Sequence, residues 1–242
     1  MTWFTGCKFS EMAIFRGAKF GSEADFTATS VEHFFTMSES EFTEAPEFNQ
    51  ADFKRAPDLD GMKFSLPGFL RTGKPSLIRT YRALRRVAIQ GADYEREQMA
   101  FKGEIRSKRG TEHRWYHAAF WYGLAYDALS DFGRSMSRPS LIWLISIAVF
   151  ALFYLANSGK LGSAFADCAA AGAPNYESAL IISWKNALPL IGIGSKAEEI
   201  AHGCLYGGAA YGGITIQGLQ KVWSAVLMFL FLLAVRNQFR IK

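Results

Sequence analysis

The stretch Pro189–Ser195 has the residue types that could bind an ion through backbone carbonyl groups. It reads Pro189, Leu190, Ile191, Gly192, Ile193, Gly194 and Ser195, and it directly follows a helix-compatible segment, 176–188. Two alternate glycines allow neighbouring carbonyl groups to face one axis, which is how a backbone can replace the water shell of an ion. A surface turn explains two glycines about as well. The stretch therefore predicts either a carbonyl-lined cation path or a turn.

A short helix, alternate glycines and a glycine-rich link to a second apolar run resemble the pore loop of two-span potassium channels, whose strip reads Thr-Val-Gly-Tyr-Gly. Gly192 and Gly194 match the two glycines, and Ile193 takes the place of the tyrosine. Leu190 stands where the channels have the threonine, and Ser195 replaces the acidic residue that usually follows. The resemblance implies a monovalent cation as the permeant species and departs from the pattern of potassium selectivity.

Two cysteines flank this stretch. Cys168 and Cys204 both lie in the segment 157–213, which we place outside the cytoplasm below. An oxidising compartment permits a bridge between them, so we expect a Cys168–Cys204 disulfide, with two free buried thiols as the alternative. Cys7 is expected to be a buried filler.

The remaining polar residues do not form a recognisable catalytic pattern. His113 and His117 have the i,i+4 spacing that can hold a metal on one helix face, but no third ligand accompanies them, so no metal site is expected. No Ser/His/Asp or Cys/His grouping, phosphate loop or pair of carboxylates stands at a familiar spacing. We therefore expect a protein that is not an enzyme and has no cofactor.

Two apolar runs must position the glycine stretch. They cover Leu141–Ala156 and Val222–Val235, and both are somewhat short of the ~20 residues that cross a bilayer, so a buried soluble helix is the alternative. Basic residues stand outside the pair of runs: Arg134, Arg138, Arg236, Arg240 and Lys242. The positive-inside rule then predicts a two-span domain, 139–242, in the inner membrane, with outer loop 157–213 and both termini cytoplasmic.

Large apolar residues recur every eleven positions in the N-terminal part. One series is Phe4, Phe15, Phe26, Met37, Phe48 and Leu59, and the other is Phe9, Phe20, Val31, Phe42, Phe53 and Phe64. Merged, they alternate steps of five and six, a period that neither a helix nor a flat strand has. A fixed repeat of this kind predicts a solenoid whose units stack to bury a shared core.

The units Ala18-Lys19-Phe20, Ala24-Asp25-Phe26 and Ala51-Asp52-Phe53 resemble pentapeptide repeats. That family implies a right-handed quadrilateral β-helix for residues 1–66, with about three coils of about 22 residues each. The residues at four small-residue positions depart from the pattern, and distortion is expected there: Phe35, Pro46, Pro57 and Met62.

A helical connector, 75–133, is expected between these parts. The first helix follows Pro75, the second runs from Asp93 through Arg106 and ends near Gly110, and the third begins at Thr111 and ends near Phe132. The third is rich in Trp and Tyr, which favour the headgroup zone, so it predicts an interfacial helix. The basic stripe of the first helix predicts a solvated face or contact with acidic lipid headgroups. A nucleic-acid partner is not expected.

The whole order of elements resembles bacterial pentapeptide-repeat membrane proteins with a two-span, ion-channel-like C-terminal part. The resemblance implies a multi-domain protein that forms an oligomeric pore in the lipid bilayer, a tetramer being favoured. Its cytoplasmic repeat domain would sense a ligand or protein partner. The alternative is a membrane-anchored scaffold or interaction protein without conduction.

Overall fold

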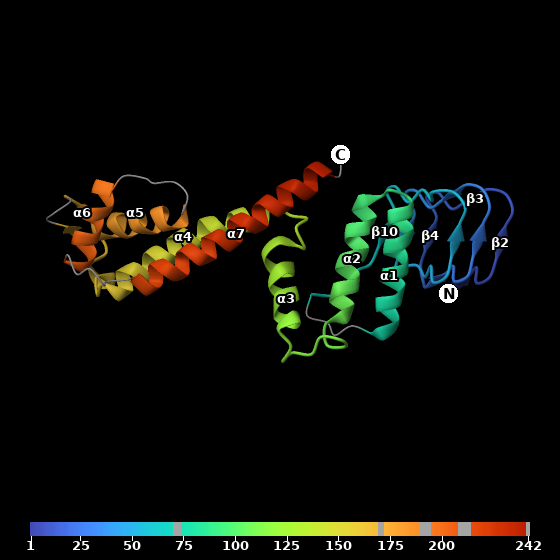
Figure 1. Cartoon of the computed structure of the whole chain (residues 1–242), viewed down its shortest axis with the longest axis horizontal. Coiled ribbons are helices and arrows are strands. Elements are labelled where there is room, and N and C mark those ends of the chain that lie inside the picture. The colour runs from blue at the N-terminus through green and yellow to red at the C-terminus, as the bar shows by residue number, and fades with distance from the viewer. Residues whose placement is uncertain (70–73, 169–171, 189–194, 208–213, 241–242) are drawn as a thin grey trace. The chain divides into compact units, whose positions relative to one another are not determined.

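The computed structural model describes residues 1–69, 74–168, 172–188, 195–207 and 214–240. It divides into two compact units, Met1–Ala125 and Tyr126–Arg240. The first holds short parallel strands and a helical hairpin, and the second is mainly helical (Figure 1). Each unit is described separately below.

The repeat region, residues 2–64, contains ten two-residue strands. They are β1 (Thr2–Trp3), β2 (Lys8–Phe9), β3 (Ala13–Ile14), β4 (Lys19–Phe20), β5 (Ala24–Asp25), β6 (Ser30–Val31), β7 (Phe35–Thr36), β8 (Glu41–Phe42), β9 (Asp52–Phe53) and β10 (Lys63–Phe64). Every pairing is parallel and joins residues 22 positions apart, as in Thr2↔Ala24 and Phe9↔Val31. The sheets have the orders β1-β5, β2-β6-β9, β3-β7 and β10-β8-β4. The register therefore equals two of the eleven-residue periods.

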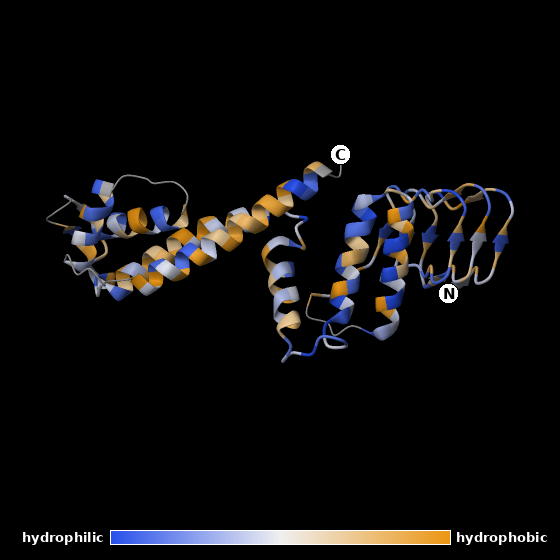
Figure 2. Ribbon diagram, viewed as in Figure 1, coloured by the Kyte–Doolittle hydropathy of each residue, from blue (hydrophilic) through white to orange (hydrophobic). Residues whose placement is uncertain are grey.

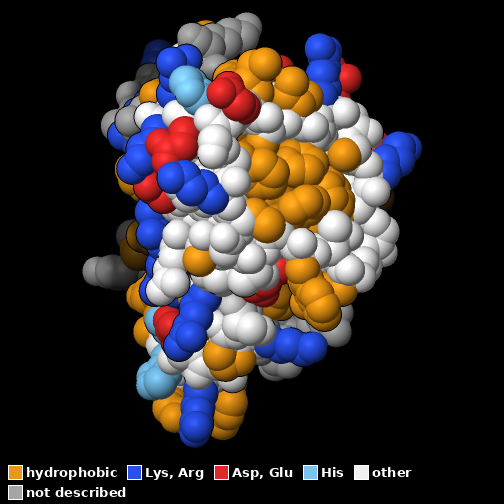
Figure 3. All heavy atoms as spheres, turned by 90° about the vertical axis from the view of Figure 1, so that its right-hand side faces the viewer, with side chains coloured by type: hydrophobic (Ala, Val, Ile, Leu, Met, Phe, Trp, Pro, Cys, Tyr) orange, Lys and Arg blue, Asp and Glu red, His pale blue; other side chains and the backbone are white. Residues whose placement is uncertain are grey.

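The apolar series lies in the core of this region. Phe26, Val31 and Met37 are fully buried, and Phe20 stacks on Phe42 with ring centroids 4.6 Å apart. A register of 22 places like residues above one another, which explains these stacks. The large residues of the first two periods are only partly buried, namely Phe4, Phe9, Phe15 and Phe20. Figure 3 faces this end of the repeat region and shows apolar side chains gathered at its centre.

The four departures from the repeat pattern have different outcomes. Phe35 is 1% exposed and keeps the regular pairing of β7 with β3, so the distortion expected there is absent. Met62 is also buried and directly precedes β10. Beside Pro46 and Pro57 the pairing shrinks to single bridges, Asp25↔Glu47 and Thr36↔Asp58. The bonds from Glu47 to Ala24 and from Asp58 to Phe35 are kept, and each proline ring restricts the backbone of the residue before it, Ala45 or Ala56, which fits the shortened pairing.

Helices α1 (Pro75–Gln90) and α2 (Tyr94–Lys108) pack against each other, and α1 covers the last strands of the repeat region. Tyr81 donates to the carbonyl of Ser65, and Gln90 donates to that of Phe53. The apolar stripe of α1 is buried as expected, and Arg79 and Arg86 are exposed as expected, whereas two other basic residues differ from the expectation. Arg82 and Arg85 are not simply solvated, because both are ion-paired with Glu104 of α2.

Helix α3 spans Ala118–Ser130, so it begins seven residues later than expected. Thr111 caps the preceding turn instead, since its hydroxyl donates to the carbonyls of Ser107 and Lys108. Trp115 and Tyr116 therefore precede the helix, and both are exposed, as are Trp121 and Tyr122 within it.

The second unit contains α4 (Ser137–Asn157), a 3-10 turn η1 (Leu161–Ser163), the antiparallel pair β11 (Asp167–Cys168) and β12 (Ala173–Pro174), α5 (Asn175–Ala187), α6 (Ser195–Tyr206) and α7 (Ile214–Arg240). Among the described residues, α4 and α7 are the two helices that are long and apolar enough to cross a membrane, judged by length and composition. Figure 2 shows apolar residues along most of both. Both helices extend beyond the apolar runs of the sequence.

Candidate functional site: a short helix held between two apolar helices

Helix α5 packs against both long apolar helices of the second unit. Its Ala179 and Ile182 are buried with Tyr154 and Leu155 of α4 and with Leu205 of α6. Contacts with α7 complete the packing. A helix of 13 residues is thus enclosed on several sides by other helices.

The C-terminal end of α5 lies beside the apolar part of α4 rather than beyond its end. Trp143 donates from Nε1 to the carbonyl of Ala187 over 3.2 Å, and the Ser183 hydroxyl donates to the carbonyl of Ile147 over 2.7 Å. Increasing numbers in α5 meet decreasing numbers in α4, so the two helices are antiparallel. Trp143 lies six residues into α4, about 9 Å along its axis from Ser137. Helix α5 therefore runs alongside most of α4.

A buried polar network fixes α5 between its neighbours. Gln220 of α7 donates from Nε2 to both the hydroxyl and the carbonyl of Ser183, each over 2.8 Å. Tyr154 of α4 donates to Oε1 of Gln220 over 2.7 Å and accepts from Asn186 of α5 over 3.1 Å. All four side chains are at most 2% exposed. A polar group buried among apolar residues is costly unless it is paired, so the network specifies one arrangement of the three helices.

A charged cluster joins α5 to α6. Lys185 is ion-paired with Glu198, and Nε2 of His202 lies 3.9 Å from Oε1 of Glu198. Gln217 of α7 lies 3.4 Å from the same histidine nitrogen. Burial and the nearby Lys185 charge lower the pKa of His202 below its usual 6.5. The ring is therefore neutral at neutral pH.

The far end of α6 is tied to the segment that follows α4. Cys168 and Cys204 form a disulfide, with Cα atoms 5.8 Å apart, so the predicted bridge is present. Lys160 donates to the carbonyl of Cys204. Cys7 is a free cysteine of intermediate burial, less enclosed than expected.

The glycine stretch itself lies largely outside the described residues. This holds for Pro189, Leu190, Ile191, Gly192, Ile193 and Gly194, while Ser195 begins α6. Leu188 is the last described residue before the stretch, and it lines the same pocket as Trp143 of α4 and Leu227 of α7. The structure thus places Leu188, the residue before the stretch, between the two apolar helices.

The network residues were not among the sequence-predicted sites. A signal for them exists, because Tyr154 and Gln220 are polar residues in largely apolar helices, but which partners they meet depends on how the helices pack. Among the residues that the structure describes, no group of three or more His, Cys, Asp or Glu side chains could hold a metal ion.

No family model, curated protein or solved structure matches this chain.

Proposed function

We propose that this protein is an oligomeric membrane pore, in which α4 and α7 span the inner membrane and α5 is a re-entrant helix. The observation that carries this is the position of Ala187, whose carbonyl accepts from Trp143 about 9 Å inside α4. If α4 spans the bilayer, the end of α5 is at membrane depth. Non-helical backbone is tolerated at that depth only where it is enclosed by protein or lines a water-filled path.

The segment 189–195 would then supply the path. The C-terminal end of a helix carries a partial negative charge, which favours a cation near the end of α5. Gly192 and Gly194 would let carbonyls converge on that cation. Two spans of one chain cannot enclose a path, so several copies around an axis are required, and a tetramer fits the channel-like order of elements.

The repeat region would be a cytoplasmic right-handed quadrilateral β-helix of the pentapeptide-repeat type. Its uniform register of 22 residues and its stacked phenylalanines support this assignment. Both termini would be cytoplasmic, because the basic residues stand at one end of the two long helices. The exposed rings of Trp115, Trp121 and Tyr122 fit the headgroup zone next to the first span.

A second function is favoured by the apolar end of the repeat region. The phenylalanines of the first two periods are only partly buried, and Trp3 nearby is 69% exposed. Exposed apolar patches mark contact sites for other proteins. The alternative is therefore a membrane-anchored scaffold whose repeat region binds a cytoplasmic partner and whose helices do not conduct.

Planar-bilayer recording of the purified full-length protein tests the pore. Wild type should conduct a monovalent cation, and Gly192→Val should abolish the current while leaving assembly intact. Gly162→Val is the matched control, because a side chain at Gly162 would meet open space and should leave the current unchanged. A silent wild type under varied voltage, pH and membrane tension would support the scaffold instead. An unchanged current in Gly192→Val would place the path elsewhere.

A further inference from the structure

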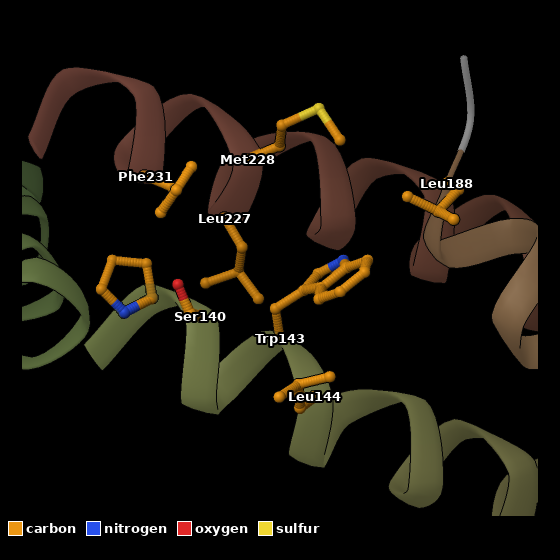
Figure 4. Close-up of a pocket in the computed structure, with 8 residues that line it drawn as sticks. Ser140, Trp143, Leu144, Leu188, Leu227, Met228 and Phe231 are labelled. Atoms are coloured by element: carbon orange, nitrogen blue, oxygen red, sulfur yellow. The ribbon is translucent and has the colours of Figure 1, made fainter. Parts of the chain in front are cut away.

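The second unit contains an apolar cavity of about 290 Å³ between α4, α7 and the end of α5. Its walls include Ser140, Trp143 and Leu144 of α4 and Leu227, Met228 and Phe231 of α7, whose side chains converge in Figure 4. The polar side-chain atoms of Ser140 and Trp143 are both engaged elsewhere, by the carbonyls of Met136 and Ala187. The lining therefore presents hydrocarbon to an occupant, and the polar side-chain atoms of Ser140 and Trp143 already have hydrogen-bond partners.

Two arginines lie at those ends of α4 and α7 that are nearest to this cavity. Arg138 directly precedes Pro139, another lining residue, and Arg236 follows Phe231 by five residues, about 7.5 Å of helix. Asn237 donates to the carbonyl of Gly133 over 3.5 Å, which brings the end of α7 next to the start of α4. Both arginine side chains are exposed, and Asp131 lies 4.0 Å from Arg138.

We propose that this cavity holds an acyl chain of an anionic phospholipid whose phosphate lies at Arg138 and Arg236. The proposal rests on the membrane placement of α4 and α7 given above. The cavity begins just inside the arginines, which is the order of headgroup and hydrocarbon in one leaflet. Basic groups at the cytoplasmic membrane surface attract anionic headgroups.

Charge favours a lipid over a second copy of the chain as the occupant. Copies related by an axis along the membrane normal present the same arginines at the same depth. A neighbouring copy would therefore add positive charge around the cavity, whereas a phosphate neutralises it. Leu188 also lines the cavity, so a bound chain would contact the residue just before Pro189.

Lipid binding to the full-length protein in detergent tests the site. Phosphatidylglycerol with a photoreactive acyl chain is cross-linked, and the modified peptides are mapped by mass spectrometry, with phosphatidylcholine of the same chain as comparison. We expect preferential labelling by phosphatidylglycerol at Trp143, Met228 and Phe231. Arg138→Gln should weaken phosphatidylglycerol binding about fivefold. Lys221→Gln is the matched control, because Lys221 is exposed on α7 and does not line the cavity, and it should bind as wild type does.

A second variant, Leu144→Trp, should block acyl-chain labelling by filling the cavity, whereas Leu219→Trp on an exposed position of α7 should not. Equal labelling by both lipids, or labels that avoid these residues, would overturn the site. Cross-links between two copies of the protein at position 144, found in place of lipid labels, would assign the cavity to a second copy. They would also overturn the lipid site. The readout is independent of conduction, so a silent bilayer recording with intact phosphatidylglycerol labelling would reject the pore and keep the lipid site.

Discussion

Glu104 shows how one buried residue organises the charges of the first unit. Its carboxylate lies 2.8 Å from Lys108 and 3.2 Å from Arg82, and its side chain is 6% exposed. Burial acts to raise the pKa of Glu104, but the hydrogen bonds and charges of Lys108 and Arg82 outweigh it and lower that pKa below 4.5. The residue therefore stays ionised at neutral pH and links α1 to α2.

Replacing this carboxylate should loosen the helical hairpin. Glu104→Gln removes charge-assisted hydrogen bonds, and we expect a loss of about 1–3 kcal/mol in the free energy of unfolding. Hydrogen exchange of the α1 and α2 amides in the full-length protein measures it. Glu112→Gln serves as control, since Glu112 is exposed. Unchanged exchange in Glu104→Gln would show that the ion pairs contribute little.

His202 predicts a pH effect at the junction of α5 and α6. Its pKa is lower in the folded state than the usual 6.5, so the unfolded state binds more protons as the pH falls. The contribution of His202 to the free energy of unfolding is therefore fully present above about pH 6.5. It is lost as the pH drops through the pKa of the folded state. NMR titration of the His202 ring should give a midpoint below 6.5, and His202→Gln should remove the part of the pH dependence of stability that this residue contributes. A midpoint at or above 6.5 would mean that Glu198, rather than burial and Lys185, dominates.

At the scale of elements, the repeat strands are too short to be stable alone. Each has two residues, so their stability must come from stacking on the strands 22 residues away and from the shared core. Phe42 is central to this, because it is 5% exposed and stacks on Phe20.

Phe42→Ala should destabilise the repeat region by about 3–5 kcal/mol, since it leaves a cavity in a packed core. Limited proteolysis of the full-length protein should then cut the repeat region faster. Phe34→Ala is a matched control, because Phe34 is 39% exposed and lies in the same region. Equal proteolysis of the two variants would contradict the packed-core description.

The three-helix packing of the second unit depends on Gln220 in the same way. Gln220→Leu removes one hydrogen-bond partner each from Ser183 and Tyr154, and we expect a loss of about 1–2 kcal/mol in the free energy of unfolding. Thermal unfolding in detergent measures the change. Gln238→Leu makes the same substitution at an exposed position of α7 and should be neutral. A neutral Gln220→Leu would show that apolar packing alone holds α5.

At the scale of the whole molecule, the proposed topology has a direct test in intact cells. In a Cys7→Ser background, Ser10→Cys and Gln238→Cys should resist a membrane-impermeant maleimide, while Gly162→Cys should react. All three positions are exposed, so a lack of reaction reports the membrane barrier rather than burial. The bridged Cys168 and Cys204 should not interfere. Reaction at Ser10→Cys would show that the N-terminus lies outside, opposite to the proposed orientation.

Local patterns of the sequence predicted much of this protein. The eleven-residue period predicts strand partners 22 residues apart, because a repeat places identical surroundings at equal spacing, and the pairing Val31↔Phe53 follows it. The apolar runs predict two long helices, since apolar composition and length are properties of a segment by itself. The start of α3 at Ala118 was missed, because the turn at Thr111 depends on hydrogen bonds to the end of α2.

Much less of the candidate site could be predicted from the sequence, because its contacts depend on tertiary structure. The sequence predicted the Cys168–Cys204 pair from shared location, but it could not place α5 alongside α4 or join Tyr154 to Gln220, which are 66 residues apart. Pairing of buried polar groups is decided by which helix faces meet, and no local pattern encodes that choice. The cavity beside Trp143 has the same origin, because a void is a property of the space between helices and not of any one segment.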